Sequence, residues 1–200
     1  MKVIGLTGGI ASGKSTVSNK LRELGAVIVD ADAISREVVK KDGPVWHKIK
    51  EHFGSSVLLP SGEINRKALG NIIFNNSEAR NVLNSITHPE IFKRAKEKIK
   101  ALQKSGSKVI VFDVPLLIES GYHTMVDKIW LVYCSKETQI KRLMTRNGLS
   151  REEAISRIES QLPLEEKLRY ADEIINTEGS LSETEHQVQK LWFRYFSKEC

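Results

Sequence analysis

Near its start the chain reads Gly8-Gly9-Ile10-Ala11-Ser12-Gly13-Lys14-Ser15, which fits the pattern G-x-x-x-x-G-K-S/T. An apolar run, Val3-Ile4-Gly5-Leu6-Thr7, precedes this stretch, and a helix-like segment follows it. In a strand–loop–helix unit, glycines let successive backbone N–H groups turn inward as an anion site, and the helix N-terminus adds positive potential. A turn that only joined a strand to a helix would not need the Lys-Ser ending. The stretch therefore predicts a nucleoside-triphosphate site.

The last two residues of the motif have predicted roles of their own. Lys14 is expected to contact the β- and γ-phosphates as a point charge, and the Ser15 hydroxyl to ligate the Mg²⁺ that bridges them. The same motif occurs in GTPase switches, ATPase motors and small-molecule kinases, so it predicts phosphate binding without identifying the reaction.

The composition is that of an ordinary globular protein, with 200 residues of which 40% are hydrophobic and 28% charged. No apolar run approaches the roughly 20 residues that span a bilayer, and the N-terminus enters a strand-like run directly. We therefore expect a cytoplasmic protein without membrane contact. The two cysteines, Cys134 and Cys200, lack the spacing typical of a disulfide framework or a zinc site.

The net charge is +6, but the Lys and Arg residues are dispersed among acidic residues. A binding site for a polyanionic small molecule explains this excess of positive charge as well as a nucleic-acid surface does. We predict small-molecule partners, no nucleic-acid partner, and a monomer.

Apolar strand-like runs alternate with helical stretches, which predicts an α/β fold with a five-stranded parallel sheet flanked by helices. The five runs cover residues 2–7, 26–29, 108–112, 129–133 and 173–175. The first helix is expected over 14–24, ending at Gly25, and a tail helix over 182–196, starting at the capping pair Ser182 and Glu185. The tail helix is expected to pack through an apolar face formed by Val188, Leu191, Trp192 and Tyr195.

Two helical insertions interrupt the strands. Between 34 and 105 we expect helices over 34–40, 45–53, 66–74, 78–86 and 88–104, the last starting at Thr87-His88-Pro89-Glu90. The second insertion, 136–170, contains a capping box at Ser150 and Glu153 and a break at Pro163. The predicted organisation is a core of 1–33, 106–135 and 171–200, a helical subdomain of 34–105, and a lid of 136–170 that closes over substrate.

Acidic residues follow two of the strands, where ligands bind in open α/β sheets. Asp32 is a candidate base, or else only the N-cap of a helix beginning at Ile34, and Asp30 is a candidate structural acid. Asp113 ends the third strand in a Walker B arrangement, which places a carboxylate near Mg²⁺ or its waters, although such strands also end in Asp for turn reasons. The loop after Asp113, Val114-Pro115-Leu116-Leu117, is expected to line an acceptor pocket.

Arg142 and Arg146 stand four residues apart on the first lid helix, hence on one face. Both are candidates for contact with phosphate oxygens when the lid closes, although solvated helix arginines are common. His88 has a plain structural alternative at its helix start, and the other histidines show no metal-ligand spacing.

Taken together, these residues resemble the dephospho-coenzyme A kinase family over nearly the whole chain. That resemblance implies a P-loop kinase fold and transfer of phosphate from ATP to the ribose 3′-hydroxyl of dephospho-CoA, giving CoA and ADP in the last step of coenzyme A synthesis. It also implies a core, an acceptor-binding domain at 34–105 and a lid. The ordered matches are Gly5–Thr16 (GLTGGIASGKST), Asp30-Ala31-Asp32 with Arg36-Glu37-Val38, Gly62-Glu63-Ile64-Asn65-Arg66, His88-Pro89, Asp113-Val114-Pro115-Leu116-Leu117, Arg142, Arg146, Ser150, Arg157, Gln161 and Ala171-Asp172.

The resemblance also implies roles for single residues. Asp32 activates the 3′-hydroxyl, Lys14 and Arg142 stabilise the charge that develops, and Ser15 and Asp113 lie on the metal side. Thr7, Asp32 and His88 border the acceptor. ATP is bound by Gly8, Gly9, Ala11, Ser12, Gly13, Lys14, Ser15 and Thr16 of the loop and by Arg142 and Arg146 of the lid. The chain departs from the family pattern at Asn65, where many members have Asp, and at Thr177-Glu178, where an Asn is usual.

Three other functions compete with this one. A nucleoside or nucleotide kinase shares the loop, the lid and an acceptor domain. A GTPase switch would carry Asn-Lys-x-Asp, but Asn19-Lys20 continues as Leu21-Arg22 inside the first helix. A nucleic-acid-dependent ATPase is compatible with the positive charge.

Overall fold

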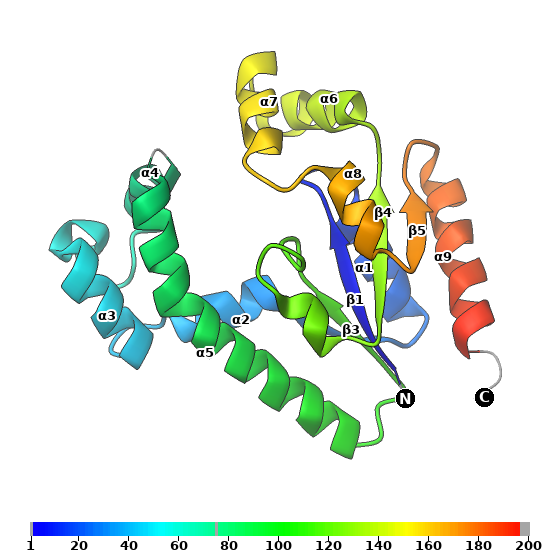
Figure 1. Cartoon of the computed structure of the whole chain (residues 1–200), viewed down its shortest axis with the longest axis horizontal. Helices are drawn as coiled ribbons and strands as arrows, with labels where there is room; N and C mark the ends of the chain where they lie inside the picture. The colour runs from blue at the N-terminus through cyan, green and yellow to red at the C-terminus, as the bar shows by residue number, and fades with distance from the viewer. Residues whose placement is uncertain (1, 75, 197–200) are drawn as a thin grey trace. The chain divides into compact units, whose positions relative to one another are not determined.

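A parallel sheet in the order β2-β3-β1-β4-β5 forms the centre of the fold (Figure 1). The strands are β1 (Lys2–Gly8), β2 (Val27–Asp30), β3 (Val109–Asp113), β4 (Lys128–Tyr133) and β5 (Glu173–Asn176). Leu6 of β1 lies opposite Asp113 on one side and Trp130 on the other. β3 is buried along its whole length, as expected for a strand covered on both faces. The predicted α/β class and five-stranded parallel sheet are confirmed, with strand ends within two residues of those expected.

The computed structural model describes residues 2–74 and 76–196. Residues 1, 75 and 197–200 lie outside the described part of the chain. They include Cys200 and the two outer ends of the predicted core, which begins at 1 and ends at 200. Contacts divide the chain into two compact units: unit 1 is Met1–Val29 with Ala101–Cys200, and unit 2 is Asp30–Lys100. The segment 136–170 therefore belongs to the same compact unit as the sheet. None of the described helices is long and apolar enough to cross a bilayer.

In unit 1 the helices α1 (Lys14–Glu23) and α9 (Leu181–Phe196) pack against each other and share a core with the sheet. α1 ends before Gly25, whose φ of +102° is the left-handed conformation typical of a helix C-terminus. The predicted packing face of the tail helix is confirmed, because its members lie in or against this core, with the fully buried Trp130 at the centre of β4. They are Val188, Leu191, Trp192 and Tyr195.

The predicted capping pair of α9 is wrong by two residues. The helix begins at Leu181, the Ser180 hydroxyl accepts from the Glu183 N–H (3.2 Å), and the Glu183 carboxylate accepts from the Ser180 N–H (2.6 Å). Glu185 instead lies 3.6 Å from the Lys20 ammonium. The sequence contains two overlapping S-x-x-E patterns, and the pair nearer Gly179 forms the cap.

The lid segment of unit 1 contains α6 (Lys136–Asn147), α7 (Arg151–Glu159), α8 (Leu164–Lys167) and the 3₁₀ turn η3 (Leu168–Tyr170). The loop after β3 contains a further 3₁₀ turn, η2 (Tyr122–Met125). The capping box at Ser150 and Glu153 is confirmed by hydrogen bonds of 3.2 and 2.8 Å. Ile140 and Leu143 of α6 and Ala154 of α7 form a separate apolar cluster, against which Ile10 and Ala11 of the glycine-rich loop pack.

Unit 2 is helical: α2 (Ala31–Val38), α3 (Pro44–Phe53), the turn η1 (Ser55–Val57), α4 (Arg66–Phe74) and α5 (Ser77–Lys104), which runs on into unit 1. The predicted break at Thr87 is wrong, since α5 is continuous with Pro89 inside it. The Thr87 hydroxyl donates to the Leu83 carbonyl (2.8 Å) within the helix rather than capping a new one. One buried face holds the helix together across the proline, formed by Thr87, Ile91, Ala95 and Ile99.

Asp172 links the start of β4 to the approach to β5. Its carboxylate accepts from the Lys128 ammonium (2.6 Å) and from the Ile129 N–H (2.8 Å). Desolvation by partial burial acts to raise the pKa of Asp172, but these hydrogen bonds outweigh it and hold the pKa below its usual value. A lowered pKa contributes stability above the unfolded-state pKa of about 3.9, and that contribution is lost as the pH falls through the folded-state pKa.

We therefore expect Asp172→Asn to lower the free energy of unfolding at pH 7, and the difference from wild type to shrink as the pH falls below 4. Urea denaturation at a series of pH values measures this. Glu97→Gln, which removes an exposed carboxyl from α5, should leave the free energy of unfolding nearly unchanged. A loss of stability in Asp172→Asn that is the same at every pH would contradict the assignment.

Candidate active site

The glycine-rich loop between β1 and α1 has the bent backbone of an anion site. Ala11 and Gly13 have φ values of +59° and +89°, and the Ser12 N–H donates to the Gly9 carbonyl (3.1 Å). Gly8 has no room for a side chain, because a Cβ there would lie 2.9 Å from the Val132 carbonyl oxygen. The Ser12 hydroxyl is buried (residue 1% exposed) and has no hydrogen-bond partner among the described residues. A loop of this shape turns N–H groups toward a bound anion.

Two glutamines of the lid segment hold the Ile10 backbone. The Gln139 amide on α6 donates to the Ile10 carbonyl (2.6 Å), and the Ile10 N–H donates to the Gln161 side chain after α7 (2.9 Å). Gln139 is buried. Side chains of the 136–170 segment therefore satisfy both backbone groups of Ile10 in the phosphate loop.

Arg142 is the predicted lid arginine that lies at the loop. Its guanidinium donates to the Ala11 carbonyl (3.3 Å) and to the hydroxyl (3.2 Å) and carbonyl of Thr177, just beyond β5. The Thr177 hydroxyl in turn donates to the Ser12 carbonyl (2.6 Å). Arg146 is exposed, and its Nε donates to the Asn147 side chain (2.9 Å). The structure thus brings Arg142 to the loop and leaves Arg146 at the surface end of α6.

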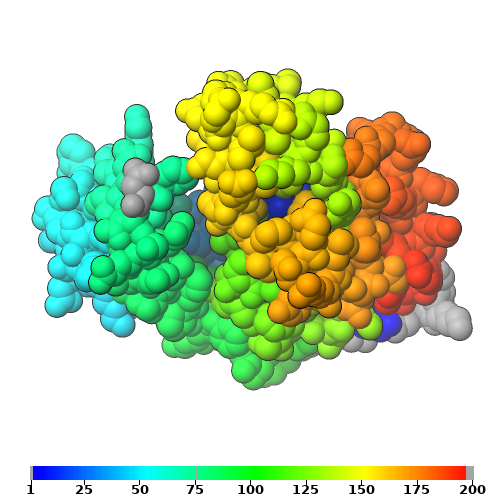
Figure 2. All heavy atoms as spheres, turned by 45° about the horizontal axis from the view of Figure 1, so that its top comes forward, coloured from blue at the N-terminus to red at the C-terminus, as the bar shows by residue number. Residues whose placement is uncertain are grey.

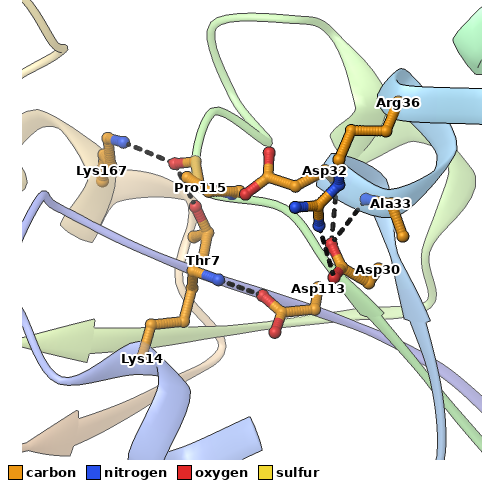
Figure 3. Close-up of polar contacts among 9 residues, drawn as sticks. All are labelled: Thr7, Lys14, Asp30, Asp32, Ala33, Arg36, Asp113, Pro115 and Lys167. Atoms are coloured by element: carbon orange, nitrogen blue, oxygen red, sulfur yellow. Dashed lines mark hydrogen bonds and ion pairs between the residues drawn. The ribbon is translucent and has the colours of Figure 1, made fainter.

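Lys14 and Asp113 are paired, as Figure 3 shows. The Lys14 ammonium donates to the Asp113 carboxylate, which is 8% exposed at the end of β3. The Val114 N–H donates to the Leu6 carbonyl (2.9 Å), which keeps the end of β3 beside β1. Ser15 is exposed in the first turn of α1. A hydroxyl and a single carboxylate thus flank the motif lysine.

This donor set fits Mg²⁺. Within residues 2–74 and 76–196, no group of three or more His, Cys, Asp and Glu side chains is placed to hold a metal ion. Mg²⁺ in nucleotide sites keeps several waters and takes its remaining ligands from one or two side chains and the substrate phosphates. Ser15 and Asp113 would supply the side-chain part of such a set.

The carbonyl of Pro115 connects the loop after β3 to β1 and to α8 (Figure 3). It accepts from the Thr7 hydroxyl (3.0 Å) and from the ammonium of Lys167 on α8 (3.1 Å). Lys167 is 0% exposed and lies 2.8 Å from the Glu119 carboxylate. Thr7 is also buried, and its hydroxyl is committed to this network. In this structure Thr7 therefore holds the loop after β3 in place through its hydrogen bond to Pro115.

In unit 2, Asp30 rather than Asp32 caps the helix after β2. One Asp30 carboxylate oxygen accepts from the Asp32 N–H (2.8 Å) and the Ala33 N–H (3.2 Å), and α2 begins at Ala31. The alternative in which Asp32 caps a helix starting at Ile34 is therefore wrong. Asp32 is an exposed carboxylate in the first turn of α2, and Asp30 has the structural role expected of it.

His88 lies in the interior of α5, not at a helix start. Burial lowers the pKa of its imidazole below the usual value. Burial thus disfavours the charged imidazolium, and an electrostatic contact with phosphate is not the expected contribution of His88.

Four residues that organise the site had no role in the sequence analysis: Gln139, Thr177, Lys167 and Glu119. Their partners are distant in sequence, so no local pattern marks them. The sequence offers two signals: polar residues within the amphipathic helices α6 and α8, at Gln139 and Lys167, and the departure from the family pattern at Thr177. Figure 2 shows dark-blue atoms of the N-terminal part of the chain at the base of a hollow bordered by the yellow-green and orange segments around α6 and α8.

Comparison with known proteins identifies a family for this chain. The model described as "Dephospho-CoA kinase" matches residues 2–183. The curated dephospho-CoA kinase of Carboxydothermus hydrogenoformans is 49% identical over 203 residues, covering 100% of this chain and 98% of that protein.

Solved structures agree with this result. The dephospho-CoA kinase from Campylobacter jejuni is 32% identical, with a TM-score of 0.74 over 99% of this chain and 98% of that one. A shikimate kinase from Acinetobacter baumannii, 17% identical with a TM-score of 0.54 over 100% of this chain and 95% of that one, shares the fold.

The contact between Gln139 and Ile10 yields a prediction. Gln139→Leu leaves the half-buried Ile10 carbonyl without its donor, at a cost of about 1–3 kcal/mol. Because that carbonyl belongs to the phosphate loop, we expect ATP affinity to fall about five- to tenfold in addition to the loss of stability. Calorimetric titration with ATP and thermal denaturation measure the two effects. Lys141→Ala, on the exposed side of the same helix, is the control. Unchanged ATP affinity in a destabilised Gln139→Leu would show that Gln139 supports only the fold.

Proposed function

This chain belongs to the dephospho-CoA kinase family and phosphorylates dephospho-CoA with ATP in coenzyme A synthesis, and we propose that the phosphoryl group goes to the ribose 3′-hydroxyl. The observation that carries the phosphate half of this proposal is the bent loop whose lysine, Lys14, is held by Asp113 at the end of the neighbouring strand. The acceptor half rests on Asp32 and on the helical unit that begins at Asp30.

In the proposed reaction, the 3′-hydroxyl oxygen forms a bond to the γ-phosphorus, and the bond from that phosphorus to the bridging oxygen of ADP breaks. The hydroxyl proton passes to the Asp32 carboxylate. Asp32 suits this task because it is exposed, it lies two residues beyond the end of β2, and Asp30 already supplies the cap of α2. Positioning of the hydroxyl and acceptance of its proton are the usual tasks of a carboxylate in phosphoryl transfer.

Charge stabilisation is assigned to the cations at the loop. Lys14 is poised by Asp113 to contact the β- and γ-phosphates, and Arg142 is carried by α6 to the backbone of Ala11. Mg²⁺ held by the Ser15 hydroxyl, and by the Asp113 carboxylate directly or through water, would neutralise charge on the phosphate oxygens. Loop N–H groups from Gly8 to Thr16 complete the proposed ATP site, with Arg146 and His88 as outer contacts to nucleotide and acceptor.

We further propose a monomeric, cytoplasmic enzyme without a nucleic-acid partner. Dispersal of the Lys and Arg residues among acidic ones supports the last point. The three-part division into core, acceptor-binding subdomain at 34–105 and lid at 136–170 is kept as part of the proposal. Tight bonding of the lid to the phosphate loop through Gln139 and Arg142 supports the assignment of the lid to the nucleotide side.

The role of Asp32 predicts a specific kinetic result. Asp32→Asn should keep ATP binding and lower kcat by roughly 10²- to 10⁴-fold, the usual scale for a positioned base. Asp30→Asn is the matched control, because Asn caps helices about as well as Asp and should preserve most of the turnover. Steady-state kinetics measures kcat for both variants and for wild type. An equal loss in the two variants, or a loss in Asp32→Asn explained by unfolding, would overturn the assignment of the base.

The substrate itself is the test of the proposed function. Remote contacts to a long acceptor orient its reacting hydroxyl, so dephospho-CoA should be phosphorylated far more efficiently than AMP or adenosine, which carry the same 3′-hydroxyl. Mass spectrometry of an ATP, Mg²⁺ and acceptor mixture should show one added phosphate, and NMR should place it on the 3′ position. Lys14→Ala is the inactive control. Comparable efficiency on AMP, or a phosphate at another position, would reject the proposed specificity.

A further inference from the structure

Lys167 is a fully buried lysine to which the proposed reaction gives no role. Its ammonium donates to the Pro115 carbonyl (3.1 Å) and lies 2.8 Å from the Glu119 carboxylate. Both partners belong to the loop that follows Asp113 at the end of β3. The helix α8, which carries Lys167, is therefore fastened to that loop at two points.

Stability alone does not account for a buried ion pair in this position. Removing an ammonium from water is costly, and replacing a buried ion pair by apolar side chains of similar volume is often neutral or stabilising. An ion pair differs from an apolar contact in one respect, because its hydrogen bonds form in only one arrangement of the two segments that carry it. The contact between Lys167 and Glu119 therefore points to the position of the loop rather than to the strength of the core.

The segment that ends at Lys167 also holds the phosphate loop. The Ile10 N–H donates to the Gln161 side chain (2.9 Å). At the next residue, the Leu162 N–H donates to the Glu119 carboxylate (3.2 Å). The 161–167 segment therefore connects the phosphate loop to the loop after β3.

The loop after β3 begins beside the pair formed by Lys14 and Asp113 (Figure 3). Pro115 is two residues beyond Asp113, and its carbonyl is held by the Thr7 hydroxyl (3.0 Å) as well as by Lys167. A shift of Pro115 would move the backbone to which the Asp113 side chain is attached. The Lys14 ammonium would move with it, because it donates to the Asp113 carboxylate.

We propose that Lys167 is a positioning residue for phosphoryl transfer. It holds the loop after β3 against the 161–167 segment and so sets the place of the Asp113 carboxylate relative to Lys14 and the phosphate loop. The proposal rests on the proposed function, because Lys167 acts through Asp113. A misplacement of about 1 Å at a reacting centre is enough to lower a rate about 10²-fold, so the contact matters more for kcat than for nucleotide affinity.

Lys167→Met tests the proposal, because methionine keeps the aliphatic bulk and removes the donor. We expect kcat with dephospho-CoA to fall about ten- to a hundredfold, with the KM for ATP changed less than about threefold. The Glu119 carboxylate loses its cation in this variant, so the Tm should also fall.

Two further variants separate the loss of position from the loss of stability. Lys167→Met/Glu119→Gln removes the unpaired charge but keeps an acceptor for the Leu162 N–H, so its Tm should rise toward that of wild type while kcat stays low. Leu191→Ala, in the core that α9 shares with the sheet, should lower the Tm and leave kcat per folded molecule unchanged. Recovery of kcat together with Tm in the double variant, or an equal fall of kcat in Leu191→Ala, would overturn the proposal.

A double-mutant cycle with Asp113→Asn tests whether Lys167 acts through Asp113. Lys167→Met should lower kcat less than about twofold further when Asp113 is already replaced. If Asp113→Asn is slow and Lys167→Met lowers its kcat by the full factor seen in wild type, the proposal for Lys167 is overturned and the proposed function stands. If Asp113→Asn has the kcat of wild type, the role of Asp113 in the proposed function is overturned, and with it the action of Lys167 through that residue.

Discussion

The phosphate loop can bind an anion only if its carbonyl groups are held away from the anion, and distant parts of the chain meet that requirement. The carbonyls of Ile10, Ala11 and Ser12 accept hydrogen bonds from Gln139, Arg142 and Thr177 respectively. Two of these donors are on α6 and one follows β5. The positive φ of Ala11, unusual for a residue with a Cβ atom, is thus stabilised from outside the loop. The rest of unit 1 can be understood as the scaffold that carries these donors.

How far the sequence predicts the structure depends on how local the cause is. Apolar runs predicted the strands because a parallel sheet buried on both faces needs continuous hydrophobic segments. Patterns that occur twice in neighbouring frames were less reliable. Ser180/Glu183 and Ser182/Glu185 share one capping pattern, and Asp30 and Asp32 both stand at the start of α2, but only Ser180 and Asp30 form the caps. Pro89 stays inside a helix because the packing of the helix face outweighs the missing hydrogen bond.

The candidate site divides in the same way. Its contiguous part, from Gly8 to Ser15, was predictable, because the chemistry of the motif is contained in one loop. Gln139, Thr177 and Lys167 were not, because each acts on a backbone group that is between 52 and 165 residues away in sequence. The two predicted lid arginines also differ in their contacts: Arg142 reaches the phosphate loop, whereas Arg146 donates to its neighbour Asn147. Helical spacing predicts that two side chains share a face, but it does not predict what that face contacts.

Lys167 has a consequence of a different kind. Its amine is completely enclosed, with Glu119 and the Pro115 carbonyl as partners, whereas most lysines in the described part of the chain lie at the surface. A reagent that acylates amines can reach Lys167 only when α8 separates from the loop that follows β3. The rate at which this one lysine is acylated in the native protein therefore reports how often that part of the molecule opens, and peptide mapping measures the rate.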